Sequence, residues 1–477
     1  MVQDDGGGGG GGSVGAYSSL IAAAAAKNEL LHKGWDSTGD YSAKREVETH
    51  GDGLDPINYH VRIEVDTYSG EYTTLAVGPS AEIARDNWIE EATAAVDKWG
   101  PKIDGLFTKW KDLPSRYSTS EALLDWAVRE LNIDPDNLTG TSDSAGGVNT
   151  RLAGDLDRLQ TRTAQLKGEY ATTFADYYVN QLPTTFQAQC LLVSALSVAC
   201  RAQGEMWGRT ADDLATFEYD ALQAMKDCGP EGGPNTSLVL TLTVVGALAA
   251  ALAAVPSLGG SAVLFEAIAL GGAIGAGVES AKTADKSFED LPLGAGHPDQ
   301  VFTNMEDALT ALDSEIRKQE TGIQDFLVAA KSFADSGDCE LTRPSLNSAP
   351  TGEVFSEVSV DKDTIGKITE LWLPSIAADL READSRLTVT SSDGFHRPTD
   401  VGLEPNGAWT EFSALQNRTS TLLTRLSTDI EDAGTKLEEA AKLIGMADEQ
   451  TNQHYRDVER QVENQNLNDP DDVLPLL

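Results

Sequence analysis

Basic residues are scarce in this 477-residue chain: 36 lysines and arginines stand against 76 aspartates and glutamates, a formal net charge of −40. Such a charge repels phosphate backbones, so we expect no nucleic-acid partner. Aromatic residues make up only 6% of the chain, whereas hydrophobic residues make up 40%. Abundant alanine and leucine with few aromatics favour helices over a β-rich core. The composition therefore predicts an acidic, mainly α-helical protein.

Recognisable catalytic and metal-binding motifs are also lacking. The six histidines form no His-x-x-x-His or His-Glu-x-x-His pair, and the four cysteines form no Cys-x-x-Cys pair. This pattern argues against a zinc site and against a thioredoxin-like centre. No Gly-x-Ser-x-Gly nucleophile turn occurs either. We therefore expect no metal, no cofactor and no enzymatic activity.

A disulfide is one of two interpretations of the cysteines. Cys190 and Cys200 fall on one predicted helix, where ten residues separate them by ~15 Å, too far for a bond. An antiparallel arrangement of the predicted helices 186–227 and 299–335 would bring Cys339 close to one of them. The sequence thus leaves open a Cys190–Cys339 disulfide or buried free thiols.

The first residues do not resemble a Sec signal peptide. Asp4 and Asp5 precede a run of glycines, and no lysine or arginine precedes the apolar stretch 20–26. We expect residues 1–39 to form a flexible glycine-rich leader with a short helix. The protein would then be cytoplasmic, or would reach the cell surface or the medium by another export route.

Next comes a predicted small α+β domain, residues 40–134. Strict alternation of apolar and polar residues in 59–65, a turn, and a second strand in 72–77 predict a β-hairpin. Residues 81–110 and 118–131 have helical periodicity, with a kink or break expected at Pro101. A linker rich in Asp, Gly, Ser and Thr follows at 135–150.

The remainder predicts an elongated antiparallel helical bundle. An apolar stripe in 152–177, a long helix to 227 and heptad-like apolar spacing in the helix 299–335 place a bundle at 151–340. A connecting segment at 341–360 leads to a helical pair at 361–460, bent at Pro374, and a disordered tail at 461–477.

Two long apolar runs lie in the middle of the bundle region and predict a helical hairpin at 238–278. The arms 238–255 and 262–278 each span ~26 Å as helices, just short of a ~30 Å hydrocarbon core. Two glycines four residues apart would let the arms approach closely. The residues that define this hairpin are Leu238, Val245, Leu252, Pro256, Leu264, Glu266, Ile268, Gly271 and Gly275.

Three interpretations of the hairpin remain open: a buried core element, a permanent two-span membrane anchor, or a hairpin that inserts conditionally. It connects two long helices at one pole of the bundle, where less protein is available to bury it. The arms lack flanking lysines and arginines, which argues against a permanent span. Protonation of Glu266, the one charge in the second arm, would remove most of the insertion penalty, so acid should favour insertion.

The C-terminal helical pair resembles substrates of actinobacterial type VII (ESX) secretion. Those proteins carry a Tyr-x-x-x-Asp/Glu export signal just past a two-helix unit, and here Tyr455 and Glu459 occupy that position. Their turn usually contains Trp-x-Gly, whereas this chain has Gly407-Ala408-Trp409, the reverse order. The resemblance implies a secreted protein, a type VII machinery as partner, and a co-secreted helical partner or a homo-oligomer.

The central region looks like the α-helical pore-forming toxins of the cytolysin A and tripartite enterotoxin type. Those proteins store an apolar helical hairpin at one end of an elongated bundle and insert it into a lipid bilayer. This resemblance rests on architecture alone. Together the two resemblances imply a secreted, non-enzymatic, membrane-inserting protein, with a soluble structural or interaction protein and a two-span membrane protein as alternatives.

Overall fold

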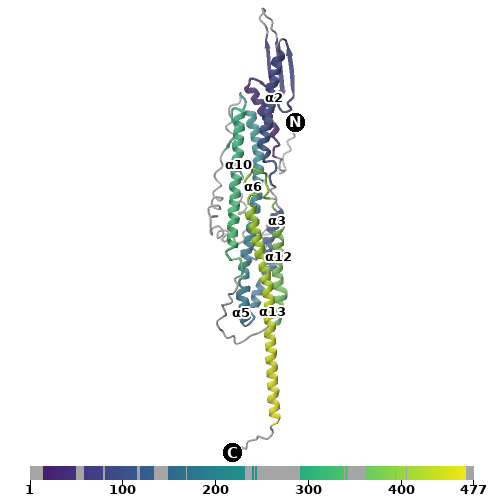
Figure 1. Cartoon of the computed structure of the whole chain (residues 1–477), viewed down its shortest axis with the longest axis vertical. Coiled ribbons are helices and arrows are strands. Elements are labelled where there is room, and N and C mark those ends of the chain that lie inside the picture. Colours follow the sequence, from purple (N-terminus) through teal and green to yellow (C-terminus); the bar gives the residue numbers. More distant parts are fainter. Residues whose placement is uncertain are drawn as a thin grey trace, which may run out of the picture.

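The computed structural model is elongated and mainly helical, with a small sheet at one end (Figure 1). It describes residues 14–49, 59–78, 81–114, 119–133, 149–167, 169–230, 239–240, 242–243, 291–337, 339–341, 361–390, 392, 394–403 and 405–468.

Four antiparallel strands form the sheet, in the order β1-β2-β3-β4: β1 (Asp36–Gly39), β2 (Ser42–Thr49), β3 (Tyr59–Asp66) and β4 (Tyr72–Val77). Alternation along β3 buries Val61, Ile63 and Val65 on one face and leaves polar residues on the other. Helices α1 (Ser18–His32) and α2 (Ala81–Thr108) pack against the sheet. The predicted hairpin of 59–65 and 72–77 is confirmed, with Val65 opposite Tyr72.

Two long helices run side by side along the molecule, α6 (Leu182–Asp227) and α10 (Pro298–Ala334). The shorter α3 (Thr119–Leu131), α4 (Thr150–Thr163) and α5 (Glu169–Phe174) lie nearer the other end, and a π-helical turn (Ala175–Val179) joins α5 to α6. The C-terminal pair consists of α11 (Lys362–Lys367), a π-helical turn (Ile368–Trp372), α12 (Leu373–Thr388) and α13 (Trp409–Asn468).

Buried apolar side chains form two cores along the long axis. The sheet-end core joins α1, α2 and the sheet to parts of α6 and α10; its members include Ile21, Leu30, Ile63, Trp99, Phe107, Phe217 and Met305. The distal core joins α3, α4, α12 and α13 to the other parts of α6 and α10; its members include Leu124, Leu156, Phe186, Phe326, Ile376 and Leu426. Because α6 and α10 contribute to both cores, they hold the two ends of the molecule together.

The domain boundaries differ from the predicted ones. Helix α3, expected within the α+β domain 40–134, packs on α6 and α12 in the distal core. Helix α1, expected in the leader, packs on α2 and belongs to the sheet-end core. The apolar stripe of a helix does not name the surface that will cover it, so sequence proximity grouped α3 with the sheet and named no partner for α1. The predicted linker 135–150 and connecting segment 341–360 lie almost entirely outside the described residues.

Local irregularities were predicted with mixed success. Helix α2 continues through Pro101 without ending. A π-helical turn immediately before α12 precedes Pro374, which lies in the first turn of that helix, so the helix is irregular near the predicted bend. Helix α13 extends to Asn468, so the tail predicted as disordered from 461 begins as helix. Its last turns project beyond the bundle (Figure 1).

Candidate functional site

The two ends of the apolar segment meet on the bundle. Strand β5 (Val239–Leu240), at its start, pairs with β6 (Leu291–Pro292), just after it, so that Leu240 lies opposite Leu291. Antiparallel pairing of these short strands brings the entry and the exit of segment 241–290 together. The two strands therefore form one closed base, at which the chain on either side of the segment is held together.

Two polar side chains of α6 bind the chain just after β5. The carboxylate of Asp213, only 3% exposed, accepts hydrogen bonds from the backbone N–H of Thr243 at 2.8 Å and from its hydroxyl at 2.7 Å. Arg209, one turn earlier, donates to the Thr243 carbonyl at 3.2 Å. A buried carboxylate needs such donors, and here they come from the chain that enters the apolar segment.

These contacts correct the predicted start of the hairpin. The first arm was expected to be helical from Leu238, but residues 239–240 form a strand, and residues 242–243 are neither helix nor strand. Pairing with β6 and with Asp213 uses backbone groups that a helix would need for its own hydrogen bonds. The remaining predicted hairpin residues, Leu238, Val245, Leu252, Pro256, Leu264, Glu266, Ile268, Gly271 and Gly275, lie outside the described residues.

Helix α1 covers the helix ends that flank the apolar segment. The Asn28 amide donates to the Met225 carbonyl, and Nε2 of His32 donates to the Cys228 carbonyl at 3.1 Å, so both bind the end of α6. The His32 ring also lies 4.7 Å from the ring of His297, which caps α10 by accepting the Asp299 N–H. Helix α1 thus covers the C-terminal end of α6 and contacts the residue that caps α10.

A cluster of charges ties α1, α2 and α10 together beside this base. The Glu29 carboxylate accepts from Lys98 at 2.8 Å and from the Trp99 indole at 2.7 Å, and Lys98 also reaches Asp299 at 3.2 Å. Burial alone would raise the pKa of Glu29, but the hydrogen bonds from Lys98, Lys33 and Trp99 outweigh it and lower that pKa. Ionised Glu29 therefore stabilises this junction.

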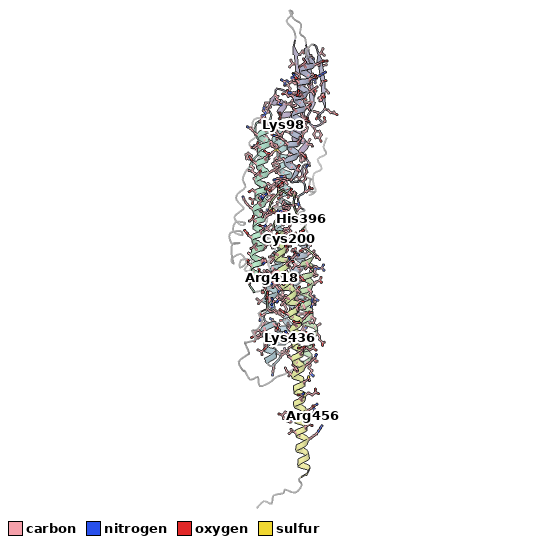
Figure 2. The ribbon with its side chains drawn as sticks, viewed as in Figure 1. Lys98, Cys200, His396, Arg418, Lys436 and Arg456 are labelled. Carbon is pink, nitrogen blue, oxygen red and sulfur yellow. The ribbon has the colours of Figure 1, made fainter. Side chains whose placement is uncertain are left out.

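The predicted export signal lies on the part of α13 that projects from the bundle. Tyr455 is 68% exposed, and Glu459, one turn later, is also exposed. Figure 2 shows the neighbouring Arg456 well beyond the bundle, on the same stretch of helix. Both predicted signal residues are therefore accessible on one helix, although the bundle places them far from the base of the apolar segment.

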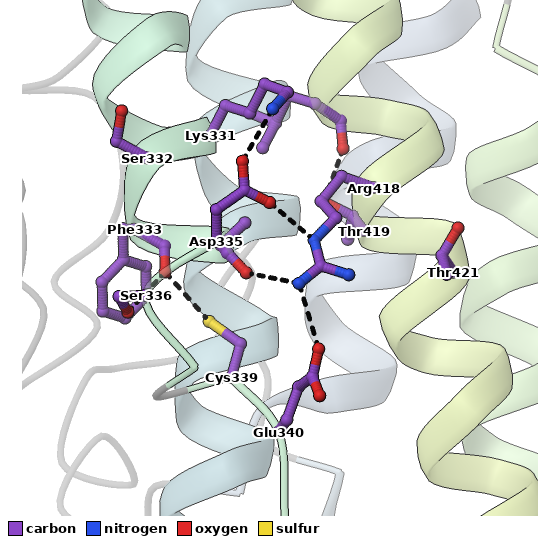
Figure 3. A network of polar contacts seen from close by, with 12 residues as sticks. Lys331, Ser332, Phe333, Asp335, Ser336, Cys339, Glu340, Arg418, Thr419 and Thr421 are labelled. Carbon is purple, nitrogen blue, oxygen red and sulfur yellow. Dashed lines mark hydrogen bonds and ion pairs between the residues drawn. The ribbon is translucent and has the colours of Figure 1, made fainter.

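A second network joins the end of α10 to α13 (Figure 3). Arg418 contacts Asp335 at 2.9 Å and Glu340 at 3.0 Å, and Lys331 contacts Asp335 at 2.7 Å. The hydrogen bond from Lys331, with help from Arg418, lowers the pKa of Asp335. This exposed network holds the C-terminal pair against the bundle.

Of the two interpretations of the cysteines, a Cys190–Cys339 disulfide or buried free thiols, the structure has the second. All four cysteines are buried thiols. Cys190 points to the Val128 carbonyl at 3.6 Å, whereas Cys339 points to the Phe333 carbonyl at 3.8 Å. Antiparallel packing brought the helices together, but the two sulfur atoms face different elements. Burial raises the pKa of the Cys190 thiol to about 12, which makes it unreactive.

A buried ion pair that sequence reasoning missed lies where the two cores meet. Arg397, in the turn between α12 and α13, pairs with Glu320 of α10, and neither side chain has exposed surface. Glu320 also accepts from the Leu403 N–H at 2.5 Å and from Gln203 at 3.2 Å. The guanidinium lies over the Trp207 ring at 5.4 Å from the ring centre. One signal of this buried polar site is present in the sequence. Gln319, the residue before Glu320, interrupts the apolar stripe of α10.

Gly407, in the predicted Gly-Ala-Trp turn, makes room for this ion pair. Its φ is +52°, and a Cβ there would overlap the guanidinium of Arg397. The adjacent Trp409 begins α13 and packs on Phe395 and Phe412, each at 5.4 Å between ring centres. The turn residues at which this chain departs from the type VII pattern therefore serve packing and close approach in this fold.

One further helical stretch, Ala171–Asp227, is long and apolar enough to cross a membrane. Its most apolar window is 83% buried inside the bundle, as expected for a core helix of a soluble protein. Among the described residues, no group of three His, Cys, Asp or Glu side chains is placed to hold a metal ion.

No protein-family model, curated protein or solved structure matches this chain.

Proposed function

We propose that this protein is a non-enzymatic, secreted helical protein that acts at a lipid bilayer through its apolar segment. In this proposal the bundle is the soluble carrier, and the segment between β5 and β6 is the membrane-active element. Insertion would be conditional and favoured by acid, through protonation of Glu266 and of the acidic surface. The proposed route of export is a type VII-like system that reads Tyr455 and Glu459.

The observation that carries this proposal is the closed base formed by β5 and β6. An apolar segment whose two ends are held together can leave the bundle as a unit without unfolding α6 or α10. The two cores of the bundle are formed by apolar side chains of the described helices. In this proposal, release of the segment leaves these two cores in place.

The exposure of Tyr455 and Glu459 supports the export part of the proposal. A signal that is read by a secretion machine must be accessible in the folded protein, and both side chains are exposed on one helical face. Neither residue contributes to the apolar cores. Their identity at this position therefore has no structural explanation among the contacts of the bundle.

Dye release from liposomes tests membrane action. We compare the intact protein with a variant in which residues 244–290 are replaced by a short Gly/Ser linker, which keeps β5, β6 and the Thr243 contacts. We expect release by the intact protein alone, increasing from neutral to acid pH. Absence of release at every pH, with both proteins folded, would favour a soluble interaction protein with a core hairpin.

The Glu266→Gln variant tests the acid dependence. Because glutamine carries no charge at any pH, we expect this variant to bind liposomes at a higher pH than the native protein does. An unchanged pH profile of liposome binding would contradict the assigned role of Glu266. It would not contradict membrane action, which the dye-release experiment tests separately.

Secretion of Tyr455→Ala tests the export signal. We expect this variant to accumulate in cells and to be lost from the culture supernatant of a type VII-competent actinobacterial host. The matched control is Tyr219→Ala, since Tyr219 is also an exposed tyrosine (54%) on a long helix, α6. Equal secretion of both variants would argue against a type VII signal at Tyr455.

A further inference from the structure

Strand β4 presents an open edge at the end of the molecule. It is the last strand of the sheet, and among the described residues no strand pairs with its outer side. Its six residues, Tyr72–Val77, include no charge, proline or glycine. Tyr72, Leu75 and Val77 are 50%, 43% and 57% exposed. An uncharged, exposed edge strand is a template for pairing with another strand.

The opposite edge of the sheet, strand β1, has features that prevent pairing with another strand, and β4 lacks them. Strand β1 has only four residues, begins with Asp36, and its pairing with β2 shifts register between Ser37 and Gly39. Short length, a charge and a register irregularity are the features by which proteins prevent edge-to-edge association. One edge of this sheet therefore carries these protective features and the other carries none.

We propose that β4 pairs with β4 of a second copy of this chain, antiparallel across a two-fold axis, to form one continuous eight-stranded sheet. The two-fold axis keeps the helix-covered faces of both sheets on the same side. Residues of the same face must then lie opposite one another. Pairing of Leu75 with Leu75 of the partner, and of Thr73 with Val77, satisfies this rule and leaves Glu71 outside the ladder.

The outer face of this seam would be apolar. Leu75 lies opposite Arg62 of β3, and Val77 lies opposite His60, so both belong to the face that α1 and α2 do not cover. In the paired sheet, the Leu75 side chains of the two copies lie directly opposite each other, and each Val77 lies opposite Thr73 of the other copy. Such pairs stabilise a sheet by roughly 0.2–1 kcal/mol each, in addition to the new backbone hydrogen bonds.

Charge favours a second copy that pairs only at this end. Each chain carries a net charge of −40, so most side-by-side arrangements of two bundles would bring acidic surfaces together. The sheet lies at the end of the elongated molecule opposite the projecting end of α13 (Figure 1). Edge pairing joins the two chains through a strand without charged residues, so no like charges face each other within the new ladder. It also keeps the two bundles apart. This inference is independent of the proposed membrane action and export.

Site-specific crosslinking tests the pairing and its register. All four native cysteines are buried, so a cysteine at position 75 would be the accessible thiol. We expect Leu75→Cys to form a disulfide-linked dimer under mild oxidation. Val77→Cys is the matched control: in the proposed register its two copies lie ~13 Å apart and should remain unlinked. Monomeric Leu75→Cys, or equal linkage of both variants, would overturn the proposal.

Analytical ultracentrifugation provides a second measurement that does not depend on oxidation. We expect the native chain to dimerise and Leu75→Lys to raise the dimer dissociation constant by at least about tenfold, because two lysines would face each other across the axis. The control is Leu443→Lys, the same change at an exposed leucine of α13, which should leave dimerisation unchanged. A monomeric native chain, or equal weakening by both variants, would contradict pairing through β4.

Discussion

Glu29 shows how a single side chain joins three helices in this protein. It lies on α1, accepts from Lys98 and Trp99 of α2, and Lys98 in turn binds Asp299 of α10. Hydrogen bonds to an ionised group contribute about 1.5–3 kcal/mol when they are shielded from water, and less at a half-buried site such as this one. The junction beside the apolar segment therefore depends on the charge of Glu29.

Glu29→Gln should destabilise the protein at neutral pH and remove part of its acid sensitivity. Because the folded-state pKa of Glu29 lies below the ordinary value of 4.5, its contribution is present above that value. It is lost as the pH falls through the folded-state pKa. Thermal melts across this pH range should show the native and variant curves converging in acid. The exposed Glu90→Gln on α2 is the control, and a constant difference at all pH values would contradict this role.

Glu320→Gln should destabilise the protein far more than an exposed substitution on the same helix. It leaves the guanidinium of Arg397 buried without a counterion, and such a change costs about 3–5 kcal/mol. Burial already lowers the pKa of Arg397 to about 10. Chemical denaturation measures the difference, with the exposed Glu306→Gln on α10 as the control. Equal stability of the two variants would show that the pair adds little.

At the scale of elements, α13 changes its environment along its length. Leu422, Leu426, Ile430, Ala433 and Leu437 are buried in the distal core, whereas Leu443 and Met446 are 68% and 60% exposed. Helix α12 and the π-helical turn before it pack on the first half of α13, whereas the last turns of α13 project beyond the bundle (Figure 1). The helix is therefore a packed element in its first half and a projecting one in its second half.

Leu426→Asp and Leu443→Asp should separate these two halves. Aspartate at 426 loses ~1.5–3 kcal/mol of burial and also places a charge in the core, so we expect the C-terminal pair to unfold. Aspartate at 443 faces water and should leave the melting temperature nearly unchanged. Circular dichroism melts of both variants give the comparison. A native melt for Leu426→Asp would contradict the packing of α13.

At the scale of the whole molecule, the charge of −40 acts against the compact state. Most ion pairs in the structure lie at the surface, for example Lys331 with Asp335, and contribute little individually. Self-repulsion of the acidic surface is therefore the main long-range electrostatic effect on stability.

Added salt should stabilise the protein. Screening shortens the Debye length from ~30 Å at about 0.01 M to ~3 Å at about 1 M, which removes most of the repulsion along the bundle. We expect the melting temperature to rise with sodium chloride over this range. A melting temperature that falls as salt increases would indicate that attractive surface pairs, such as those of Arg418, outweigh the repulsion.

The sequence by itself determined most of the local structure. Alternation in 59–65 and the apolar spacing in α2, α3, α10 and α13 predict elements that the structure contains, because these patterns report which face of a segment is buried. The mainly helical fold with a small sheet is confirmed. The exposure of Tyr455 agrees with its position after the apolar stripe.

Only the tertiary structure decided which elements meet. It assigned α1 to the sheet and α3 to the distal core, turned Cys190 and Cys339 toward different carbonyl groups, and paired Glu320 with Arg397 across 77 positions of sequence. It also replaced the expected helical start at Leu238 with the β5–β6 base. A periodic pattern fixes the direction of a buried face but contains no information on its partner, because that choice depends on shape and charge contributed by distant segments.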